Sequence, residues 1–453
     1  MPLYSILWSL VLIALGVSPS WGDVVAYVAN TNEGSASIVG LETGAVLDTI
    51  EVTSGVRRTS VSADGEEIYV ASPTTRVVQV IDVASSEVSR SLTFEEGWIP
   101  IEAVANSEGT LLHVVGSWPT GVASGVVIDT ATWESPFQYD LSPGLLPKAV
   151  AVNPRSGFVY TVMEDRQGEF PPCAVDIFCM DELIAVDPTP GGGKAEIVLG
   201  NRIGDLYVTE DGNRLYVVHH IVEEGLSRGV LSVFDTSGGD VAPVKLDQIE
   251  LTPPEGVPGP EGRRGRTPRD IAVDEDRNLL YVTHGFGDYI GIVDLTAREV
   301  VDTIALGEFC HGIDLSPDGQ RAVVALTRSS TVVVVDLVAR TVGEKIEVGR
   351  SPLAGGAFIV ERPEPTPASP TPTLQTPTAG PTIAPACVSD CDGDRAVSVA
   401  EIVTSIGIAL GSALLEVCPA ADADEDGAVG VNELIQAVVS ALEGCEPGSS
   451  SGP

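Results

Sequence analysis

The sequence has few positive charges. Of its 453 residues 25 are Lys or Arg and 64 are Asp or Glu, which gives a formal net charge of −39 at pH 7. Phosphate groups bind to cationic surfaces, so this excess of acid argues against a nucleic acid or an anionic membrane as partner. We expect neither nucleic-acid binding nor insertion into a membrane.

Long apolar runs and familiar catalytic motifs are also missing. Beyond residues 1–22, no apolar run approaches the length that crosses a bilayer. The chain contains no nucleophile elbow, HExxH, phosphate-binding glycine loop or haem-attachment CxxCH. Any catalysis would therefore rest on residues that come together only in the fold.

Residues 1–22 are typical of a secretory signal. The apolar run 6–17 is too short to span a bilayer, and Ser20 and Gly22 suit cleavage before Asp23. Seven cysteines agree with an oxidising compartment. We expect a soluble, monomeric protein that is secreted or associated with the cell envelope.

The cysteines divide into three groups. Cys173 and Cys179 share one loop and are expected to pair, which leaves Cys310 as a buried free thiol. The other four lie near the C-terminus, where three connectivities are possible: Cys387, Cys391, Cys418 and Cys445.

Residues 23–361 repeat one phrase. Its clearest copies begin at Asp270 and Ile313, and each contains four short β-branched runs separated by turn residues such as PDG. Gly40 ends the third run of the first unit. In the other six units an aspartate stands at this place and marks the period: Asp82, Asp129, Asp187, Asp235, Asp294 and Asp336.

Seven four-stranded units predict a seven-bladed β-propeller, so the chain belongs to the mainly β class. The first unit begins at its second strand, VVAYVAN, and residues 355–360 supply a lone first strand. We therefore expect the two ends of the repeat region to pair and close the ring.

The phrase itself resembles the YVTN family of seven-bladed propellers. The resemblance rests on YVAN at Tyr27, IYVAS at Ile68, LYVTH at Leu280 and the SPDG turn at Ser316. It implies an extracytoplasmic surface or binding protein, with some enzymes on related propellers, and it specifies the fold better than the activity.

Segments 390–401 and 422–433 place carboxylates at positions 1, 3, 5 and 12, the spacing of a calcium-binding loop. A solvated acidic loop is the alternative, but the pattern recurs after 32 residues. Gly427 gives the second loop a sharp turn where the first has Arg395. We expect two Ca²⁺ ions, held by Asp390, Asp392, Asp394, the Ala396 carbonyl, Ser398 and Glu401, and by Asp422, Asp424, Asp426, the Ala428 carbonyl and Glu433.

Each loop runs into an apolar helix, but prolines and cysteines leave no room for a helix before it. Residues 386–446 therefore resemble a type I dockerin module, a small α-helical calcium-binding domain. The resemblance implies docking to a cohesin-like partner, although this chain has Val399, Ala400, Val431 and Asn432 where that family has hydroxyl groups. Residues 362–385 read as a Pro/Thr-rich linker, and 447–453 as a disordered tail.

One face of the predicted propeller carries all the large insertions. Loops between second and third strands, and loops between blades, open on the same face, and the insertions at 163–182, 219–229 and 251–268 lie there. Such a face usually binds a ligand. The alternative is decoration that the fold tolerates.

The residue just before each innermost strand is expected to surround the channel mouth on that face. The seven residues are Arg57, Ile101, Lys148, Gly204, Arg269, His311 and Leu353. Arg57, Lys148, Arg269 and His311 can carry positive charge. Their potential would favour an anionic small molecule or glycan. The alternative is that they pair with the neighbouring acids Glu102, Asp205 and Asp270.

His219 and His284 end the YVxN phrase in consecutive blades. With His311 they could hold a metal ion, or they could simply bond to neighbouring loops. The sequence favours a noncatalytic binding or surface protein. The alternatives are a hydrolase, lactonase or metal-dependent oxidoreductase acting at the channel mouth, and a purely structural envelope component.

Overall fold

The structure is a computed structural model. It describes residues 23–165, 181–200, 202–223, 226–253, 267–362, 388–391, 396–409, 415–422, 429, 433–434, 437–438 and 440–441. The chain divides into two compact units, Met1–Ala368 and Ser369–Pro453. The predicted signal, nearly all of the linker, the tail, and Cys173 and Cys179 lie outside the described residues.

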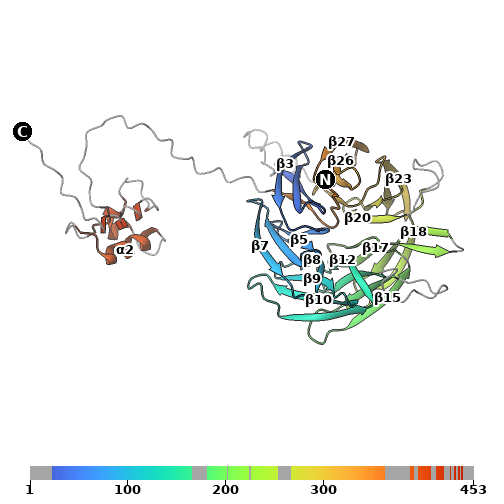
Figure 1. The fold of residues 1–453 in the computed structure, drawn as a ribbon, viewed down its shortest axis with the longest axis horizontal. Helices are drawn as coiled ribbons and strands as arrows, with labels where there is room; N and C mark the ends of the chain where they lie inside the picture. Colours follow the sequence, from blue (N-terminus) through green and yellow to red (C-terminus); the bar gives the residue numbers. More distant parts are fainter. Residues whose placement is uncertain are drawn as a thin grey trace, which may run out of the picture. The chain divides into compact units, whose positions relative to one another are not determined.

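The described residues of the first unit form seven four-stranded antiparallel sheets arranged in a ring, as predicted (Figure 1). Their innermost strands are β28 (Ile359–Glu361), β4 (Arg58–Val61), β8 (Ile99–Ala105), β12 (Leu145–Val152), β16 (Leu206–Val208), β20 (Pro268–Asp274) and β24 (Ile313–Leu315). The second strands are β1 (Val24–Asn30), β5 (Glu67–Ser72), β9 (Leu111–Ser117), β13 (Val159–Asp165), β17 (Arg214–Glu223), β21 (Leu279–His284) and β25 (Arg321–Leu326).

The outer half of each blade is a tight hairpin. Its third strands are β2 (Ser35–Gly40), β6 (Val77–Asp82), β10 (Val122–Asp129), β14 (Asp181–Val186), β18 (Leu226–Asp235), β22 (Tyr289–Asp294) and β26 (Thr331–Asp336). Its outermost strands are β3 (Ala45–Glu51), β7 (Glu87–Thr93), β11 (Phe137–Pro143), β15 (Lys194–Gly200), β19 (Val244–Glu250), β23 (Glu299–Ala305) and β27 (Thr341–Glu347).

The two ends of the repeat region close the ring. Strand β28 pairs with β1, with Val24 opposite Glu361 and Ala26 opposite Ile359. The Tyr27 amide adds a hydrogen bond of 2.8 Å to the Phe358 carbonyl. The predicted closure of the first blade by the last strand is therefore confirmed.

The repeated aspartate ends the third strand and shapes the turn to the fourth. Asp294 Oδ1, for example, accepts the amides of Thr296 and Ala297 at 2.8 and 2.7 Å. Asp336 does the same for Val338 and Ala339. These bonds hold the turn while the residue four positions after each aspartate, Arg298 or Arg340, adopts a left-handed conformation with φ of 63° or 57°. The aspartate is therefore needed at the same place in each blade, which explains why it marks the period in the sequence.

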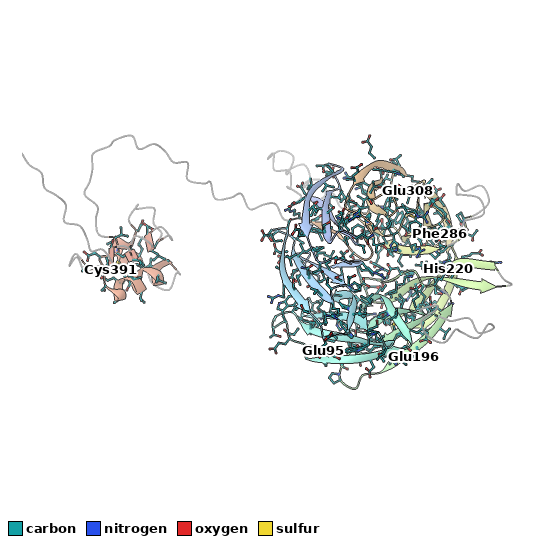
Figure 2. The ribbon with its side chains drawn as sticks, in the orientation of Figure 1. Glu95, Glu196, His220, Phe286, Glu308 and Cys391 are labelled. Carbon is teal, nitrogen blue, oxygen red and sulfur yellow. A yellow bond between two sulfur atoms is a disulfide. The ribbon has the colours of Figure 1, made fainter. Side chains whose placement is uncertain are left out.

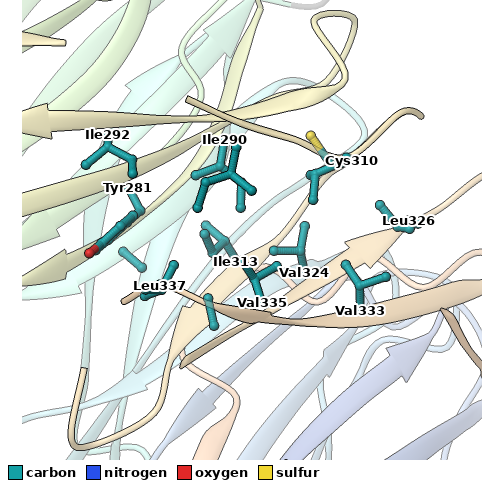
Figure 3. Close-up of a cluster of buried hydrophobic side chains, with 14 residues drawn as sticks. Tyr281, Ile290, Ile292, Cys310, Ile313, Val324, Leu326, Val333, Val335 and Leu337 are labelled. Carbon is teal, nitrogen blue, oxygen red and sulfur yellow. The ribbon is translucent and has the colours of Figure 1, made fainter. Parts of the chain in front are cut away.

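Buried β-branched side chains fill the spaces between neighbouring sheets (Figure 2). One such cluster joins the last two complete blades and includes Ile290, Ile313, Val324 and the free thiol of Cys310 (Figure 3). Cys310 is fully buried and unpaired, as predicted. Seven inter-blade layers of this kind would hold the ring rigid around its channel.

One expectation about the insertions is wrong. Segment 219–229 is no loop, because β17 and β18 continue their pairing through Val222 opposite Ser227 and Glu223 opposite Leu226. Each strand is ten residues long. The insertion therefore lengthens a hairpin, while most of 163–182 and 251–268 falls outside the described residues.

In the second unit the described residues include helix α2 (Val399–Ala409) and the 3₁₀ turns η1 (Leu415–Val417) and η2 (Pro419–Ala421). A disulfide joins Cys391 to Cys418, which the sequence left open, and it lies beside a small core that includes Ala421 and Val429. Across the described residues, no helix is long and apolar enough to cross a membrane.

Candidate binding site at the propeller channel

The predicted ring positions fall on β-bulges in three blades. The pairing register shifts between Pro100 and Glu102, between Pro147 and Ala149, and between Pro268 and Ile271. The residues skipped include Ile101, Lys148 and Arg269, which therefore lie inside their strands and not before them. Bulges redirect side chains and are common next to binding sites.

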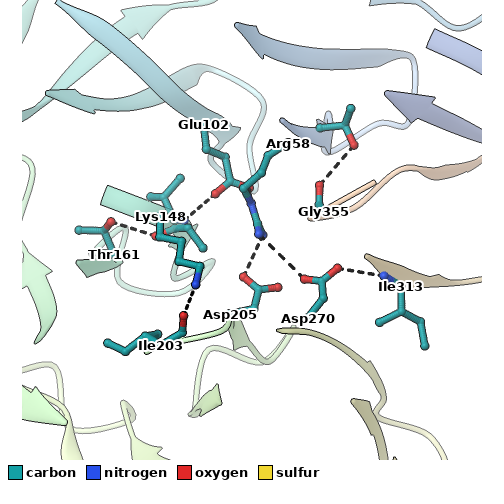
Figure 4. Close-up of polar contacts among 12 residues, drawn as sticks. Arg58, Glu102, Lys148, Thr161, Ile203, Asp205, Asp270, Ile313 and Gly355 are labelled. Carbon is teal, nitrogen blue, oxygen red and sulfur yellow. Dashed lines mark hydrogen bonds and ion pairs between the residues drawn. The ribbon is translucent and has the colours of Figure 1, made fainter. Parts of the chain in front are cut away.

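At the next position of the alignment, four of the seven blades contribute a charged residue to a cluster in the channel (Figure 4). The Arg58 guanidinium donates from Nε to Glu102 Oε1 and from Nη2 to Asp205 Oδ1, both at 2.8 Å. Its Nη1 lies 4.0 Å from Asp270 Oδ1. The Arg58 side chain is 12% exposed and the three carboxylates at most 4%, so solvent screens these contacts weakly.

The cluster holds more negative than positive groups. Burial raises the pKa of Glu102 to about 7, although Arg58 opposes the shift. Burial and the neighbouring Asp205 raise the pKa of Asp270 well above its usual range. Burial by itself would lower the pKa of Arg58, but the three carboxylates more than offset it. The cluster therefore keeps a proton at pH values where exposed carboxyl groups have lost theirs.

The same carboxylates also tie neighbouring blades together. Glu102 Oε2 accepts the Val150 amide at 2.8 Å, and Asp270 Oδ2 accepts the Ile313 amide at 2.9 Å. In the next blade Asp314 accepts the amides of Phe358 and Ile359, both at 2.7 Å. These bonds give the acids a structural role that does not depend on any ligand.

The predicted cations lie close enough for their charges to interact. Burial, together with the charges of Arg269, Lys148 and Arg58, lowers the pKa of His311 to about 3. Burial and Arg269 lower the pKa of Lys148, which Glu164 opposes from 4.0 Å. Arg57 is exposed and is not part of this group. The structure thus gathers Lys148, Arg269 and His311.

These cations are not neutralised by the acids that the sequence offered as partners. Lys148 Nζ donates to the Ile203 carbonyl, while Arg58 takes Glu102 and Asp205. Two buried atoms, Arg269 Nε and His311 Nδ1, have no hydrogen-bond partner among the residues that the structure describes. A buried polar atom without a partner costs free energy, and an acceptor supplied by a ligand would recover it.

Two arginines and two phenylalanines lie together beside this group. Arg269 and Arg328 each stack on the edge-to-face pair of Phe286 and Phe309, with guanidinium-to-ring distances of 4.7 to 5.7 Å. Phe286 is 42% exposed. Stacking of this kind leaves the guanidinium N–H groups directed away from the rings and able to bind an anion.

A cavity of about 480 Å³ occupies the channel on the other side of the Arg58 cluster. Arg58, Glu102 and Asp205 line its inner end, and the turns at 274–277 and 316–319 line its opening. Acidic residues outnumber cations in its outer lining, where Arg277 lies among Glu210, Asp274, Glu275, Asp276 and Asp318. The channel is therefore cationic near Arg269, blocked by the Arg58 cluster, and acidic at the far end.

The histidines do not form the metal site that the sequence allowed. Within the described part of the chain, which contains His219, His284 and His311, no three His, Cys, Asp or Glu side chains are placed to hold a metal ion. His219 lies 2.8 Å from Ser232 Oγ through Nε2, and His284 stacks on Tyr289 with ring centroids 4.4 Å apart. Both histidines are buried within their blades.

Sequence reasoning missed Arg58, the centre of the cluster. The alignment of innermost strands stopped at Arg57, one residue earlier. The next position in the same alignment holds Arg58, Glu102, Asp205 and Asp270 in four blades. One cation and three acids at the same aligned position could therefore have indicated a charged cluster in the channel.

Of the predicted calcium ligands, the structure describes Asp390, Ala396, Ser398, Glu401, Asp422 and Glu433. Glu401 lies in the first turn of α2, and its carboxylate accepts the Cys391 amide at 2.7 Å and the Ser398 amide at 2.8 Å. Glu433 is 2% exposed. Asp392, Asp394, Asp424, Asp426 and Ala428 lie outside the described residues.

No protein-family model and no curated protein matches the chain. Solved structures do. Hydrazine synthase of Kuenenia stuttgartiensis has a TM-score of 0.57 and 16% identity, over 71% of this chain and 97% of that one. The periplasmic gluconolactonase of Pseudomonas aeruginosa has a TM-score of 0.55 and 15% identity, over 76% and 100%.

A functionally unknown protein from Desulfotomaculum acetoxidans matches with a TM-score of 0.55 and 13% identity, over 75% of this chain and 99% of that one. At such low identity these similarities establish the fold and no activity. The chain is a seven-bladed β-propeller, and its YVTN and dockerin resemblances stay predictions.

Proposed function

We propose that this is an exported binding protein whose propeller takes an anionic ligand, a small molecule or a glycan, at the cationic end of its channel. The observation that carries the proposal is the group of Lys148, Arg269 and His311. Besides burial, Arg269 lowers the pKa of Lys148, and both cations lower the pKa of His311. Arg269 Nε and His311 Nδ1 are buried and have no hydrogen-bond partner among the described residues. A carboxylate or sulfate would relieve both costs.

The excess of acid in the rest of the chain strengthens this argument. With 64 Asp and Glu against 25 Lys and Arg, most cations have a carboxylate available. Arg298, for instance, pairs with Asp247, and Arg321 with Glu42. In the channel group, Lys148 has a carboxylate only at 4.0 Å, that of the partly exposed Glu164, within the described part of the chain. Such a long, solvated contact neutralises the group weakly.

Calorimetric titration with uronic acids and uronate oligosaccharides tests the proposal, using wild type, Arg269→Gln and Arg298→Gln. Arg298 is the control because it is an exposed arginine that pairs with Asp247 and, among the described residues, makes no contact with the channel group. We expect binding to weaken at least tenfold in Arg269→Gln and to be unchanged in Arg298→Gln. Equal binding by all three proteins, or none by wild type, would overturn the proposal.

We further propose that the C-terminal unit binds calcium and mediates docking. The residues fit: Glu401, at loop position 12, already folds back on the backbone of positions 2 and 9, and Glu433 is a buried carboxylate. Bound Ca²⁺ would balance the carboxylates of each loop, so ion binding and folding are coupled.

Capture from the producer's own envelope and secreted proteins tests docking, with the full chain as bait. A cohesin-like partner that binds with Ca²⁺ and is released by chelator would support it. A matched bait with Glu401→Gln and Glu433→Gln should capture nothing. Capture that is the same with and without calcium would contradict a calcium-dependent docking module.

One observation favours an enzyme as the alternative. Glu102 has a pKa of about 7 and lines the channel cavity, which suits a general base or acid near neutral pH. The gluconolactonase among the similar structures suggests aldonolactones as probes. Ring opening followed by pH-stat, and lost in Glu102→Gln, would favour a lactonase. A rate equal to that of the buffer would favour the binding protein.

A further inference from the structure

The three tryptophans in the described part of the chain all line one pocket at the rim of the propeller. Trp98, Trp118 and Trp133 join Phe94 around a cavity of about 350 Å³. The residues come from the end of β7, the start of the next blade, the β9–β10 connection and the β10–β11 turn. Since only 5% of the chain is aromatic, this concentration is unusual.

The floor of the pocket is fixed by internal contacts. Trp98 is 3% exposed and donates its indole N–H to Ser124 Oγ at 2.9 Å. Its ring lies against Phe94, with centroids 4.7 Å apart. Phe94 and Trp98 therefore form a rigid aromatic base. Its indole N–H group is bonded to Ser124 and cannot donate to a ligand.

The walls are different. Trp118 and Trp133 are partly exposed, and neither indole N–H has a hydrogen-bond partner within the described residues. Arg90 lies over the Trp133 ring, 4.5 Å from its centroid, and so holds the ring in place. Glu95 and Gln138 add a carboxylate and an amide to the lining of the pocket.

Trp133 occupies an unfavourable backbone position. Its φ is 60°, at the turn where equivalent blades have Gly44 at 59°, Ser86 at 58° and Arg298 at 63°. A bulky aromatic residue rarely adopts this conformation, because its side chain crowds the backbone. Glycine would adopt this φ without strain, whereas tryptophan raises the energy of the backbone at this turn.

We propose that this tryptophan pocket binds a neutral glycan. A pyranose ring has an apolar C–H face and a rim of hydroxyl groups. Aromatic faces match the first, and the indole, carboxylate and amide groups match the second. Glu95 is the one ionised group among the lining residues, and Arg90 lies behind them on the Trp133 ring, so the lining offers no cation to an anionic ligand. The volume lies in the range of small-molecule sites.

This site is separate from the channel mouth. Glu95 marks the tryptophan pocket and Phe286 the cationic group, and they lie well apart on the ring (Figure 2). A protein with both sites would hold a neutral stretch of glycan at its rim and an acidic group at its channel. The two proposals can therefore fail independently.

Titration calorimetry of the full chain tests the pocket, with neutral hexasaccharides of β-1,4-linked glucose, xylose and mannose and of α-1,4-linked glucose as probes. We expect at least one of them to bind saturably. Affinity should fall at least tenfold in Trp118→Ala and in Trp133→Gly, and the second variant also relieves the turn, so its fold is not at risk. Arg269→Gln should leave this binding unchanged.

Saturable binding lost in both tryptophan variants, with wild-type thermal unfolding and intact binding in Phe286→Ala, would support the proposal. Absence of saturable binding for every hexasaccharide would overturn it. Binding that survives Trp118→Ala and Trp133→Gly would overturn it as well. Uronate binding in Trp133→Gly reports separately on the channel site.

Discussion

The guanidinium of Arg58 lies 2.8 Å from the carboxylate of Asp205, a residue 147 positions later and three blades further around the ring. The same arginine contacts Glu102 of the adjacent blade and approaches Asp270. One side chain thus connects four of the seven blades across the channel. It also separates the cationic end from the acidic cavity.

We expect Arg58→Ala to destabilise the propeller by about 3–5 kcal/mol, because it leaves three buried carboxylates without their cation. Chemical denaturation followed by far-UV circular dichroism would measure this. Arg350→Ala is the control, because Arg350 pairs with Glu33 at the surface and is 71% exposed. Its loss should cost less than about 1 kcal/mol. Similar values for the two variants would contradict a buried cluster.

Glu102 should make the propeller less stable as the pH rises from about 4.5 to 7. Its pKa is near 4.5 in the unfolded chain and about 7 in the folded protein, so the folded state holds more protons in this interval. The stability that the neutral carboxyl contributes is complete below pH 4.5 and is lost as the pH passes 7.

Glu102→Gln stays neutral at every pH, which isolates this effect from the histidines. Relative to wild type, its free energy of unfolding should rise by roughly 1–3 kcal/mol between pH 4.5 and 8. Urea denaturation at several pH values would show it. The exposed control Glu344→Gln should follow wild type. Parallel curves for Glu102→Gln and wild type would show that the carboxyl titrates normally.

Closure of the ring depends on the segment just before β28. Phe358 is fully buried, and its carbonyl and amide bond to Tyr27 and Asp314. Phe358→Ala should therefore cost about 3–5 kcal/mol in thermal or chemical unfolding of the whole propeller. Phe286→Ala, at an exposed site, should cost about 1 kcal/mol or less. A small effect at Phe358 would mean that the ends contribute little.

Removal of calcium should unfold the C-terminal unit and spare the propeller. A chelator should reduce the helical circular dichroism signal, which includes α2, and leave the β signal of the propeller unchanged. Glu401→Gln should reproduce the loss, and Glu344→Gln should not. An unchanged helical signal in chelator would contradict calcium-dependent folding. The Cys391–Cys418 disulfide should be kept intact during this test, since it stabilises the unit independently.

Repetition made the fold predictable. The period-marking aspartates ended the third strands because their carboxylates hold the turn, as at Asp294 and Asp336. The incomplete units at the two ends predicted the pairing of β1 with β28. Both inferences use local chemistry that the sequence shows directly.

The site was predicted less completely, because it depends on register. The alignment found Lys148, Arg269 and His311 but could not show the bulges that free Lys148 and Arg269 from the ladder. It named Arg57, which is exposed, and passed over Arg58 at the next position, whose side chain pairs with Glu102 and Asp205 in the channel. In a strand, one residue changes the face of the side chain. It also proposed a loop at 219–229 where β-branched residues extend a hairpin.

The tryptophan pocket left no signal in the sequence. Trp98, Trp118 and Trp133 stand at different positions of the repeat, on a blade connection, a second-to-third-strand loop and an outer turn. Only the packing of two adjacent blades brings them to one cavity. Contacts of this kind depend on the angle between neighbouring sheets, which no repeat pattern specifies.

The most direct test of the anion site is the ionisation of His311, followed by NMR of the ¹³C-labelled imidazole with and without a saturating uronate. Without ligand, its pKa should be about 3, because burial, Arg269 and Lys148 all disfavour the charged ring. A bound carboxylate should raise that pKa toward the ordinary value near 6.5. A pKa that the uronate leaves unchanged would contradict an anionic ligand at the cationic end of the channel.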